Sequence, residues 1–296
     1  MRIAFAGTAP FAALVLERVA GGRHPVVVCI TAPDKPRGRH GTPQPSPLKV
    51  AAVERDLPVL QPVGLDGGFA SELARFEPDV FVACAYGMIV PAAVFESVLS
   101  LVVHPSPVPR WRGAAPVVRA LMAGETELGV ATLKMTAGVD EGPVADERAV
   151  HVPREADAGE AYGLLAGPAA LSLIGTLDAI EAGTVVWQPQ TGEASYAEKL
   201  TDADRTIDWA RDAQAIADRV RALSPEVGAV TELGGRRVLL WKAAVAEPPA
   251  ADDTRDRLVI ACGEGWLEVL ELQEEGRRRI TAQEYLRGAG RRLARP

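Results

Sequence analysis

Cysteine, histidine and aromatic residues are scarce in this sequence. Its 296 residues include three cysteines and four histidines, and 5% are aromatic. Cys29, Cys84 and Cys262 are widely spaced and odd in number, which excludes a disulfide framework and a zinc knuckle. Because two of the three lie within apolar runs, we expect buried, reduced thiols and a cytoplasmic protein. The low aromatic content predicts a mostly aliphatic core.

Long apolar runs and a leader segment are also missing. The best run, residues 80–95, is interrupted by Tyr86, Gly87 and Pro91, so no segment is expected to span a bilayer. The first residues reach a glycine after one short apolar run, which predicts a strand instead of a signal peptide. With 48% hydrophobic and 24% charged residues, the composition predicts a soluble globular protein of about two domains.

The chain is acidic overall but basic in two segments. A net charge of −7 argues against a protein coated with positive charge for nucleic acid. The basic residues are Lys35, Arg37, Arg39 and Lys49 in the first segment, and Arg277, Arg278, Arg279, Arg287, Arg291, Arg292 and Arg295 in the second. Such patches fit a polyanion contacted at a few places. On charge alone, a solvated loop and a frayed C-terminal segment are the favoured interpretation.

The first half of the chain alternates between strand-like and helix-like segments. Strands are predicted at residues 2–6, 26–30, 79–86, 99–104 and 129–135, and helices at 71–76, 117–123 and 161–177. This alternation indicates βαβ units, and so an α/β domain with a mostly parallel, Rossmann-like sheet. In such sheets ligands bind beyond the carboxyl ends of the strands.

After a predicted helix at 212–223, short β runs separated by turn residues predict a smaller, barrel-like (OB-like) C-terminal domain. We therefore divide the chain into a catalytic domain at 1–190, a linker at 191–205 and a barrel-like domain at 206–296.

Two motifs follow predicted strands. In HPSPVPRWRGAAP, residues 104–116, alternate prolines force a rigid, extended loop directly after a strand. Its first residue, His104, is the side chain type best suited to proton transfer near neutral pH, although a histidine at a strand end is more often structural. In MTAGVDEGP, residues 135–143, Asp140 either orients an imidazole or forms an Asx turn. The sequence contains no G-x-S-x-G, H-E-x-x-H or G-x-G-x-x-G, so covalent, metal and dinucleotide chemistry have no support.

The combination of motifs resembles the formyltetrahydrofolate-dependent formyltransferases, and the resemblance extends over nearly the whole chain. It is carried by FAGTAPFAA, PDKPRGRHGTPQPSPLKV, FVACAYGMIVP, HPSPVPRWRGAAP, MTAGVDEGPV, SYAEKLTDADRTIDW and RALSPEVGAV. It implies the formyltransferase fold followed by a tRNA-binding barrel. The implied reaction moves the formyl group of 10-formyltetrahydrofolate to the amino group of methionine esterified to initiator tRNA, in translation initiation. A cytoplasmic monomer without a metal is expected.

The resemblance also implies roles for individual residues. His104 stabilises the oxyanion or relays the proton, and Asp140 fixes its tautomer and charge. The implied folate-binding residues are Tyr86, Gly87, Met88, Ile89, Ser106, Pro107, Val108, Pro109 and Gly138. The implied tRNA-binding residues are Arg37, Arg39, Lys49 and Lys199, with further backbone contacts from the arginine-rich C-terminal segment.

The chain departs from the family pattern at one important position. The pattern has an asparagine two residues before the histidine, and here that position is Val102, which cannot donate a hydrogen bond to the formyl oxygen. The pattern's leucine pair is also changed, to Pro107-Val108. Either Ser106 or a backbone N–H replaces the donor, or the chain is a slow or non-catalytic folate- or tRNA-binding relative. A formyltransferase acting on another amine, such as an amino sugar, is the remaining alternative, although it requires neither the basic loop nor the barrel.

Overall fold

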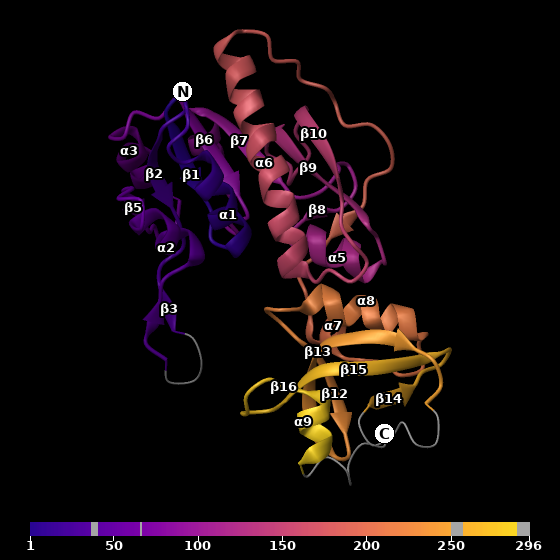
Figure 1. Ribbon diagram of the computed structural model, residues 1–296. Helices are drawn as coiled ribbons and strands as arrows, with labels where there is room; N and C mark the ends of the chain where they lie inside the picture. The colour runs from indigo at the N-terminus through magenta and orange to yellow at the C-terminus, as the bar shows by residue number, and fades with distance from the viewer. Residues whose placement is uncertain (37–40, 66, 250–256, 289–296) are drawn as a thin grey trace. The chain divides into compact units, whose positions relative to one another are not determined.

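The computed structural model describes residues 1–36, 41–65, 67–249 and 257–288 (Figure 1). The chain forms two compact units. The first contains Met1–Pro116, Glu127–His151 and Tyr162–Ala197; the second contains Val117–Thr126, Val152–Ala161 and the described residues from Glu198 onward. Residues 191–197 of the expected linker therefore belong to the first unit, and two short segments of the expected catalytic domain belong to the second.

A seven-stranded sheet forms the first unit, in the order β10-β9-β7-β6-β1-β2-β5. Its strands are β1 Ile3–Ala6, β2 Val26–Ile30, β5 Val59–Leu60, β6 Val80–Cys84, β7 Leu99–His104, β9 Glu127–Lys134 and β10 Val144–His151. The five strands from β7 to β5 are parallel, whereas β9 and β10 are antiparallel to their neighbours. Every residue of β1 and β6 is buried, as expected for central strands covered on both faces. The predicted mostly parallel sheet is confirmed.

Strand β10 was not predicted from the sequence. It carries Asp146, Glu147 and Arg148 and is at the edge of the sheet. Charged residues are common on edge strands because they discourage pairing with another chain, but they mask the apolar pattern by which a strand is recognised. Two smaller sheets pair β3 Lys35–Pro36 with β4 Pro43–Gln44, and β8 Arg112–Gly113 with β11 Tyr196–Ala197.

The helices described in the first half of the chain are α1 Pro10–Val19, α2 Pro47–Val53, α3 Gly67–Ala74, α4 Ala92–Phe95, α5 Pro116–Met122 and α6 Ala158–Glu181. Two of them begin at recognisable sequence signals. Helix α1 has a proline in its first turn. Helix α2, which was not predicted, begins after Ser46, whose hydroxyl accepts a hydrogen bond from the Lys49 amide at 3.1 Å. Cys29 and Cys84 are fully buried, as predicted, and burial raises the pKa of both thiols.

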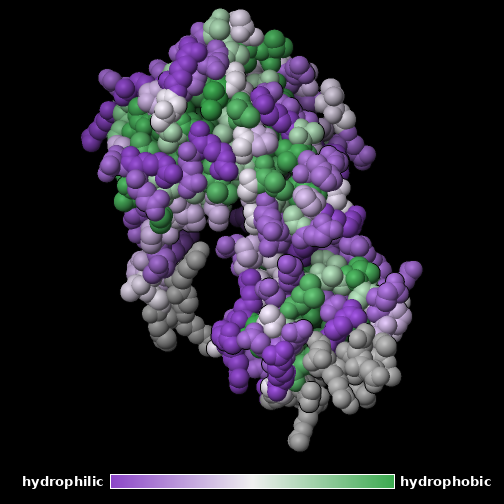
Figure 2. Space-filling view, viewed as in Figure 1, coloured by the Kyte–Doolittle hydropathy of each residue, from purple (hydrophilic) through white to green (hydrophobic). Residues whose placement is uncertain are grey.

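Helix α6 corrects the expectation that no segment is long and apolar enough to cross a membrane. Its 24 residues meet that criterion by length and composition alone. The helix also contributes to the core, because Leu165, Leu173 and Leu177 are fully buried. Leu164 and Leu171 are 45% and 57% exposed, and Figure 2 shows hydrophobic residues among hydrophilic ones on the visible face of the first unit.

The second unit contains a five-stranded antiparallel sheet and a buried helix. Its elements are α7 Asp202–Arg205, α8 Ala213–Leu223, β12 Ala229–Leu233, β13 Arg236–Ala246, β14 Leu258–Ala261, β15 Trp266–Glu274, β16 Ile280–Thr281 and α9 Ala282–Arg287. The sheet curls (Figure 1) in the order β12-β13-β15-β14, with β16 beside β15. Ile216, Val220 and Leu223 on α8 pack in the core formed by these strands. The barrel-like second domain is thus a curled sheet.

Asp204 makes several contacts within the second unit. Its Oδ2 accepts a hydrogen bond from Arg119 Nη2 at 2.9 Å and one from the Thr201 amide at 2.8 Å. The hydrogen bonds with Arg119, followed by those with Thr201, hold the pKa of Asp204 well below its usual range. A carboxyl whose pKa is lower in the folded than in the unfolded protein stabilises the fold at pH values above the unfolded pKa. This stabilisation is lost as the pH falls toward the folded-state pKa.

We therefore expect Asp204→Asn to lower the free energy of unfolding at pH 7 by about 1–3 kcal/mol, the usual contribution of hydrogen bonds to a charged group. The difference from the parent should shrink below about pH 4, where the unfolded carboxyl is protonated. Urea denaturation at pH 7 and pH 3.5 measures both values. Asp202→Asn is the control, because the Asp202 side chain is fully exposed. An equal loss at both pH values would contradict this role.

Candidate functional site

Three neighbouring parallel strands have their carboxyl ends on the same side of the first sheet. His104 is the last residue of β7, which runs parallel to β6, and β6 runs parallel to β1. The turn after β1 contacts the turn after β6, because the Thr8 amide donates to Ala85 O at 3.1 Å and the Thr8 hydroxyl to Tyr86 O at 3.0 Å. The motifs around Tyr86 and His104 therefore follow adjacent strand ends, where ligands of α/β sheets bind.

His104 and Asp140 lie against each other. The His104 Nδ1 atom is 3.5 Å from Asp140 Oδ2, and the two side chains are 6% and 11% exposed. The other ring nitrogen, Nε2, is 2.9 Å from the Trp111 carbonyl oxygen. A carbonyl only accepts, so Nε2 carries the hydrogen of that bond and Nδ1 faces the carboxylate. The imidazole is therefore held on both sides, with a negative charge beside Nδ1.

The backbone holds Asp140 in an uncommon conformation. Its φ is +54°, in the left-handed region that non-glycine residues seldom adopt. Its Oδ2 accepts a hydrogen bond from the Gly113 amide at 2.8 Å. The segment around Asp140 thus contacts the His104 motif at two points, the imidazole and the backbone of Gly113.

The route of the chain to Asp140 differs from the expected one. Strand β9 is antiparallel to β7, and the Met135 amide just after it bonds Ser100 O, near the start of β7, at 2.8 Å. The Asp140 carboxylate nevertheless reaches His104 at the end of β7. The loop after β9 therefore runs back along β7 to reach His104. It does not begin beside His104, as it would if β9 were parallel to β7.

The residues after His104 form a buried, internally bonded loop. Ser106 is 2% exposed, and its hydroxyl donates to Arg110 O at 2.9 Å. Pro107 is half-buried, whereas Val108 and Pro109 are buried. Because the Ser106 hydroxyl is already bonded to its own loop, the structure gives no support to its replacing the missing asparagine.

Val102 lies in an apolar setting. It packs, with Val144, against a cluster of Val108, Ala131 and Leu133. Valine suits these neighbours, which offer no polar side-chain atom near position 102.

The expected folate-binding turn after β6 combines a buried and an exposed part. Tyr86 is 5% exposed, its hydroxyl has no hydrogen-bond partner among the described residues, and burial raises its pKa to about 12. Gly87 has a φ of +74°, which a glycine adopts readily. Met88 and Gly138 are half-buried, whereas Ile89 is 89% exposed.

The expected tRNA-binding residues have different surroundings. Arg37 and Arg39 lie outside the described residues. The ammonium of Lys49 is 2.7 Å from Asp34 Oδ2 and 2.8 Å from Gln61 Oε1. The Lys49 hydrogen bond keeps the pKa of Asp34 low. Asp34 directly precedes Lys35, the first residue of the basic segment. Lys49 of that segment is therefore paired with an acid just outside it. Lys199 is exposed.

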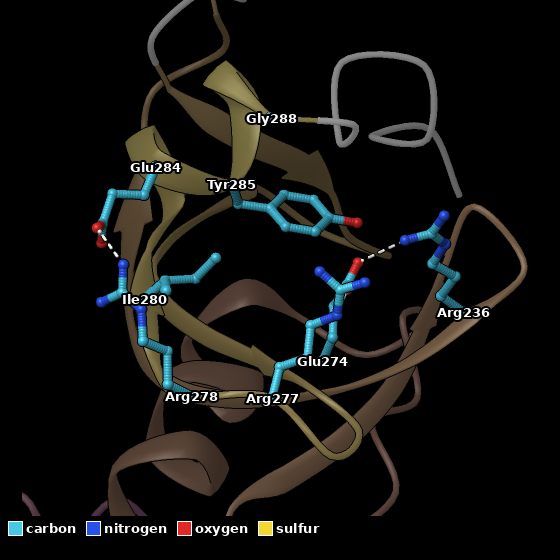
Figure 3. A pocket seen from close by; sticks show the side chains of 8 residues that line it. All are labelled: Arg236, Glu274, Arg277, Arg278, Ile280, Glu284, Tyr285 and Gly288. Carbon is cyan, nitrogen blue, oxygen red and sulfur yellow. Dashed lines mark hydrogen bonds and ion pairs between the residues drawn. The ribbon is translucent and has the colours of Figure 1, made fainter.

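A hollow of about 360 Å³ in the second unit is lined by three arginines (Figure 3). Arg236 Nη1 and Arg277 Nε bond the two oxygens of Glu274 at 2.9 and 3.0 Å, and Arg278 bonds Glu284 at 3.0 Å. Tyr285 projects into the hollow (Figure 3), and its buried hydroxyl has no hydrogen-bond partner among the described residues. The hollow is therefore lined by guanidinium groups that are each paired with a carboxylate, next to a buried tyrosine hydroxyl.

Sequence reasoning missed Gln190 and Ser195. The Gln190 amide bonds three residues of the two motifs, and the Ser195 Oγ accepts from the Trp111 amide at 2.9 Å. Gln190 is the last residue of the expected catalytic domain and Ser195 lies in the expected linker, and no local pattern distinguishes either residue. No group of metal-ligating side chains occurs within the described parts of the chain.

Known proteins similar to this chain share both of its units. The formyl transferase family matches residues 1–169, and the formyl transferase C-terminal domain matches residues 199–290. A methionyl-tRNA formyltransferase of Xanthomonas euvesicatoria is 42% identical, with 97% of each chain covered. One of Symbiobacterium thermophilum is 39% identical, with 98% of this chain and 93% of the relative covered.

Among solved structures, HypX from Aquifex aeolicus in complex with tetrahydrofolic acid is similar, with a TM-score of 0.67 and 18% identity. The match covers 97% of this chain, which spans about half of the HypX chain (47%). At this identity the likeness shows the fold alone.

Proposed function

Because this chain belongs to the formyl transferase family, we propose that it transfers a formyl group from 10-formyltetrahydrofolate to the amino group of methionyl initiator tRNA. The observation that carries the proposal is the contact between His104 and Asp140, 3.5 Å apart although 36 residues separate them in the chain. The acceptor is proposed from relatives that match both units. An amino-sugar acceptor is not supported by any of the relatives of comparable identity reported above.

The chemistry requires a base and a stabiliser of negative charge. The amine attacks the formyl carbon, an oxyanion develops on the formyl oxygen, and the attacking nitrogen must lose a proton. The bond from the formyl carbon to N10 of the folate then breaks, and N10 takes up a proton as tetrahydrofolate leaves. His104 accepts that proton at Nδ1, since Nε2 donates to the Trp111 carbonyl. The Asp140 carboxylate beside Nδ1 stabilises the positive charge that then develops on the ring.

We propose that the formyl donor binds along the turn after β6 and the loops of the two motifs. The exposed side chains of Ile89 and Val139, 89% and 61% exposed, offer apolar surface for a flat aromatic ring. Ser106–Pro109 and Gly138 complete this site. Binding sites of this kind are mostly apolar, with a few placed polar groups.

We propose that backbone phosphates of the tRNA meet Arg37, Arg39 and Lys199, together with the arginine-lined hollow of the second unit. The guanidinium groups there are paired with Glu274 and Glu284, but each keeps further N–H donors that suit phosphate oxygens. Lys49 contributes only if it leaves Asp34, so its share is the smallest. A cytoplasmic monomer is the proposed state.

A formyl-transfer assay tests the function directly. Purified protein is incubated with 10-formyltetrahydrofolate and methionyl initiator tRNA, and formylmethionine is measured after deacylation. Parallel reactions use a nucleotide-linked amino sugar as the acceptor. Transfer to the tRNA alone supports the proposal. Transfer to the sugar alone, or tRNA binding without any transfer, would replace it with another acceptor or a non-catalytic role.

Replacing Arg39 by alanine should weaken the use of tRNA and spare the folate site. We expect KM for tRNA to rise, and the slope of log KM against log salt concentration to fall by about 1, as for the loss of one phosphate contact. KM for the folate should not change. Arg75→Ala, an exposed arginine outside both basic segments, is the control. Equal loss of folate affinity would place Arg39 elsewhere.

A further inference from the structure

Gln190 contacts both motifs with one side chain. Its Nε2 donates to the carbonyl oxygens of Asp140 and Gly142, each at 2.8 Å. Its Oε1 accepts from Arg112 Nε at 3.0 Å and from Arg112 Nη2 at 2.7 Å. A primary amide has two donor hydrogens and two acceptor lone pairs. Gln190 therefore uses its whole hydrogen-bonding capacity on these two loops.

These bonds complete a closed ring that passes through Asp140. Arg112 binds Gln190 through its side chain, Gln190 holds the Asp140 carbonyl, and the Asp140 carboxylate accepts from the amide of Gly113, the residue after Arg112. Asp140 is thus held at its backbone by Gln190 and at its side chain by Gly113. Such bracing matters because Asp140 has a φ of +54°, a left-handed conformation that is uncommon outside glycine.

The rest of the segment 188–197 holds Gln190 in place. Its backbone bonds Val144 through Gln188, at 2.7 and 2.8 Å, just after the loop of Asp140. At its other end, the Ser195 amide donates to Pro109 O at 3.1 Å, and the Ser195 carbonyl accepts from the Arg112 amide at 2.9 Å. The segment therefore runs from one motif to the other, with Gln190 between the two attachments.

We propose that Gln190 is a positioning residue for formyl transfer: it fastens the Asp140 loop to the His104 motif and so sets the distance between the imidazole and the carboxylate. This inference rests on the proposed function. Catalytic geometry is sensitive to displacements of this kind, since a shift of about 1 Å is known to lower rates about 10²-fold.

Gln190→Ala should lower kcat about 10- to 100-fold, with KM for the folate and the tRNA changed less than about threefold. Gln190→Glu should behave similarly, because a carboxylate keeps the acceptor for Arg112 but loses both donors. Gln188→Ala is the matched control: Gln188 is exposed and bonds Val144 only through its backbone, so its kcat should equal that of the parent.

A double-mutant cycle separates positioning from a general loss of structure. If Gln190 acts through Asp140, then Gln190→Ala should reduce the remaining activity of Asp140→Asn by less than about threefold, because the two changes remove the same contribution. The same fold loss in both backgrounds, or a rise in KM alone, would overturn the proposal.

Hydrogen exchange keeps the test independent of turnover. In Gln190→Ala, amides of residues 110–114 and 138–143 should exchange faster than in the parent and in Gln188→Ala, with the core strands unchanged. If the parent transfers no formyl group, the proposed function fails, yet this measurement still decides whether Gln190 braces the loops. Unchanged exchange in both segments would overturn it.

Discussion

Replacing His104 by alanine will lower kcat for formyl transfer by about 10²- to 10⁴-fold, the range that a positioned acid or base contributes. In the proposed mechanism the imidazole takes the amine proton at Nδ1, which lies 3.5 Å from Asp140 Oδ2, while Nε2 is 2.9 Å from the Trp111 carbonyl oxygen. Folate affinity should be largely kept, because the expected folate contacts come from other residues. Steady-state kinetics and tetrahydrofolate titration measure the two quantities.

His151→Ala is the matched control for this change. His151 lies on β10, is exposed, and pairs with Glu127, so its loss should leave kcat unaltered. A thermal melt of each variant establishes that it is folded. Undiminished turnover in a folded His104→Ala protein would remove His104 from the mechanism and leave the proposed reaction without its base.

Val102→Asn should raise kcat for formyl transfer by about 10²- to 10³-fold, the usual contribution of one hydrogen-bond donor to a developing oxyanion. Val102 now packs near Val108, Ala131 and Leu133, and none of these side chains can donate a hydrogen bond to a developing oxyanion. The Ser106 hydroxyl donates to Arg110 O. We therefore expect the parent to be active but slow.

The same substitution should lower the free energy of unfolding by at most about 1–3 kcal/mol, the cost of burying an unpaired carboxamide, because Val102 is only partly buried against its apolar neighbours. Val102→Ala is the control: it also disturbs the packing but supplies no donor, so its kcat should not rise. Activation from near zero by Val102→Asn would favour a non-catalytic parent. High activity in the parent, unchanged by the substitution, would mean that another donor, such as a backbone N–H, already serves the oxyanion.

Much of the fold could be predicted from local patterns. Runs such as Val26–Ile30 and Leu99–His104 are strands of the same bounds in the structure, because short β-branched runs flanked by turn residues are a local signal. The helix predicted at 161–177 lies within α6. The prediction failed at β10, whose charges belong to an edge strand, and at the membrane criterion, which α6 meets by composition.

The sequence predicted only part of the candidate site. His104 and Asp140 could be singled out because each occurs in a dense motif after a strand, and the structure brings them together. Lys49 was grouped with free cations, whereas in the structure it is paired with Asp34, 15 residues away and outside the counted segment. A charge count along the chain carries no information on which charges meet in space.

By itself, the sequence determined most of the segments that become strands and helices, because these depend on neighbours a few positions apart. It also determined which residue types are available for proton transfer. The tertiary structure alone decided that β9 runs antiparallel, that the Asp140 loop returns along β7, and that Gln190 holds it there. These outcomes depend on hydrogen bonds between residues about 30 to 50 positions apart, and such bonds form only when the fold has brought their partners together.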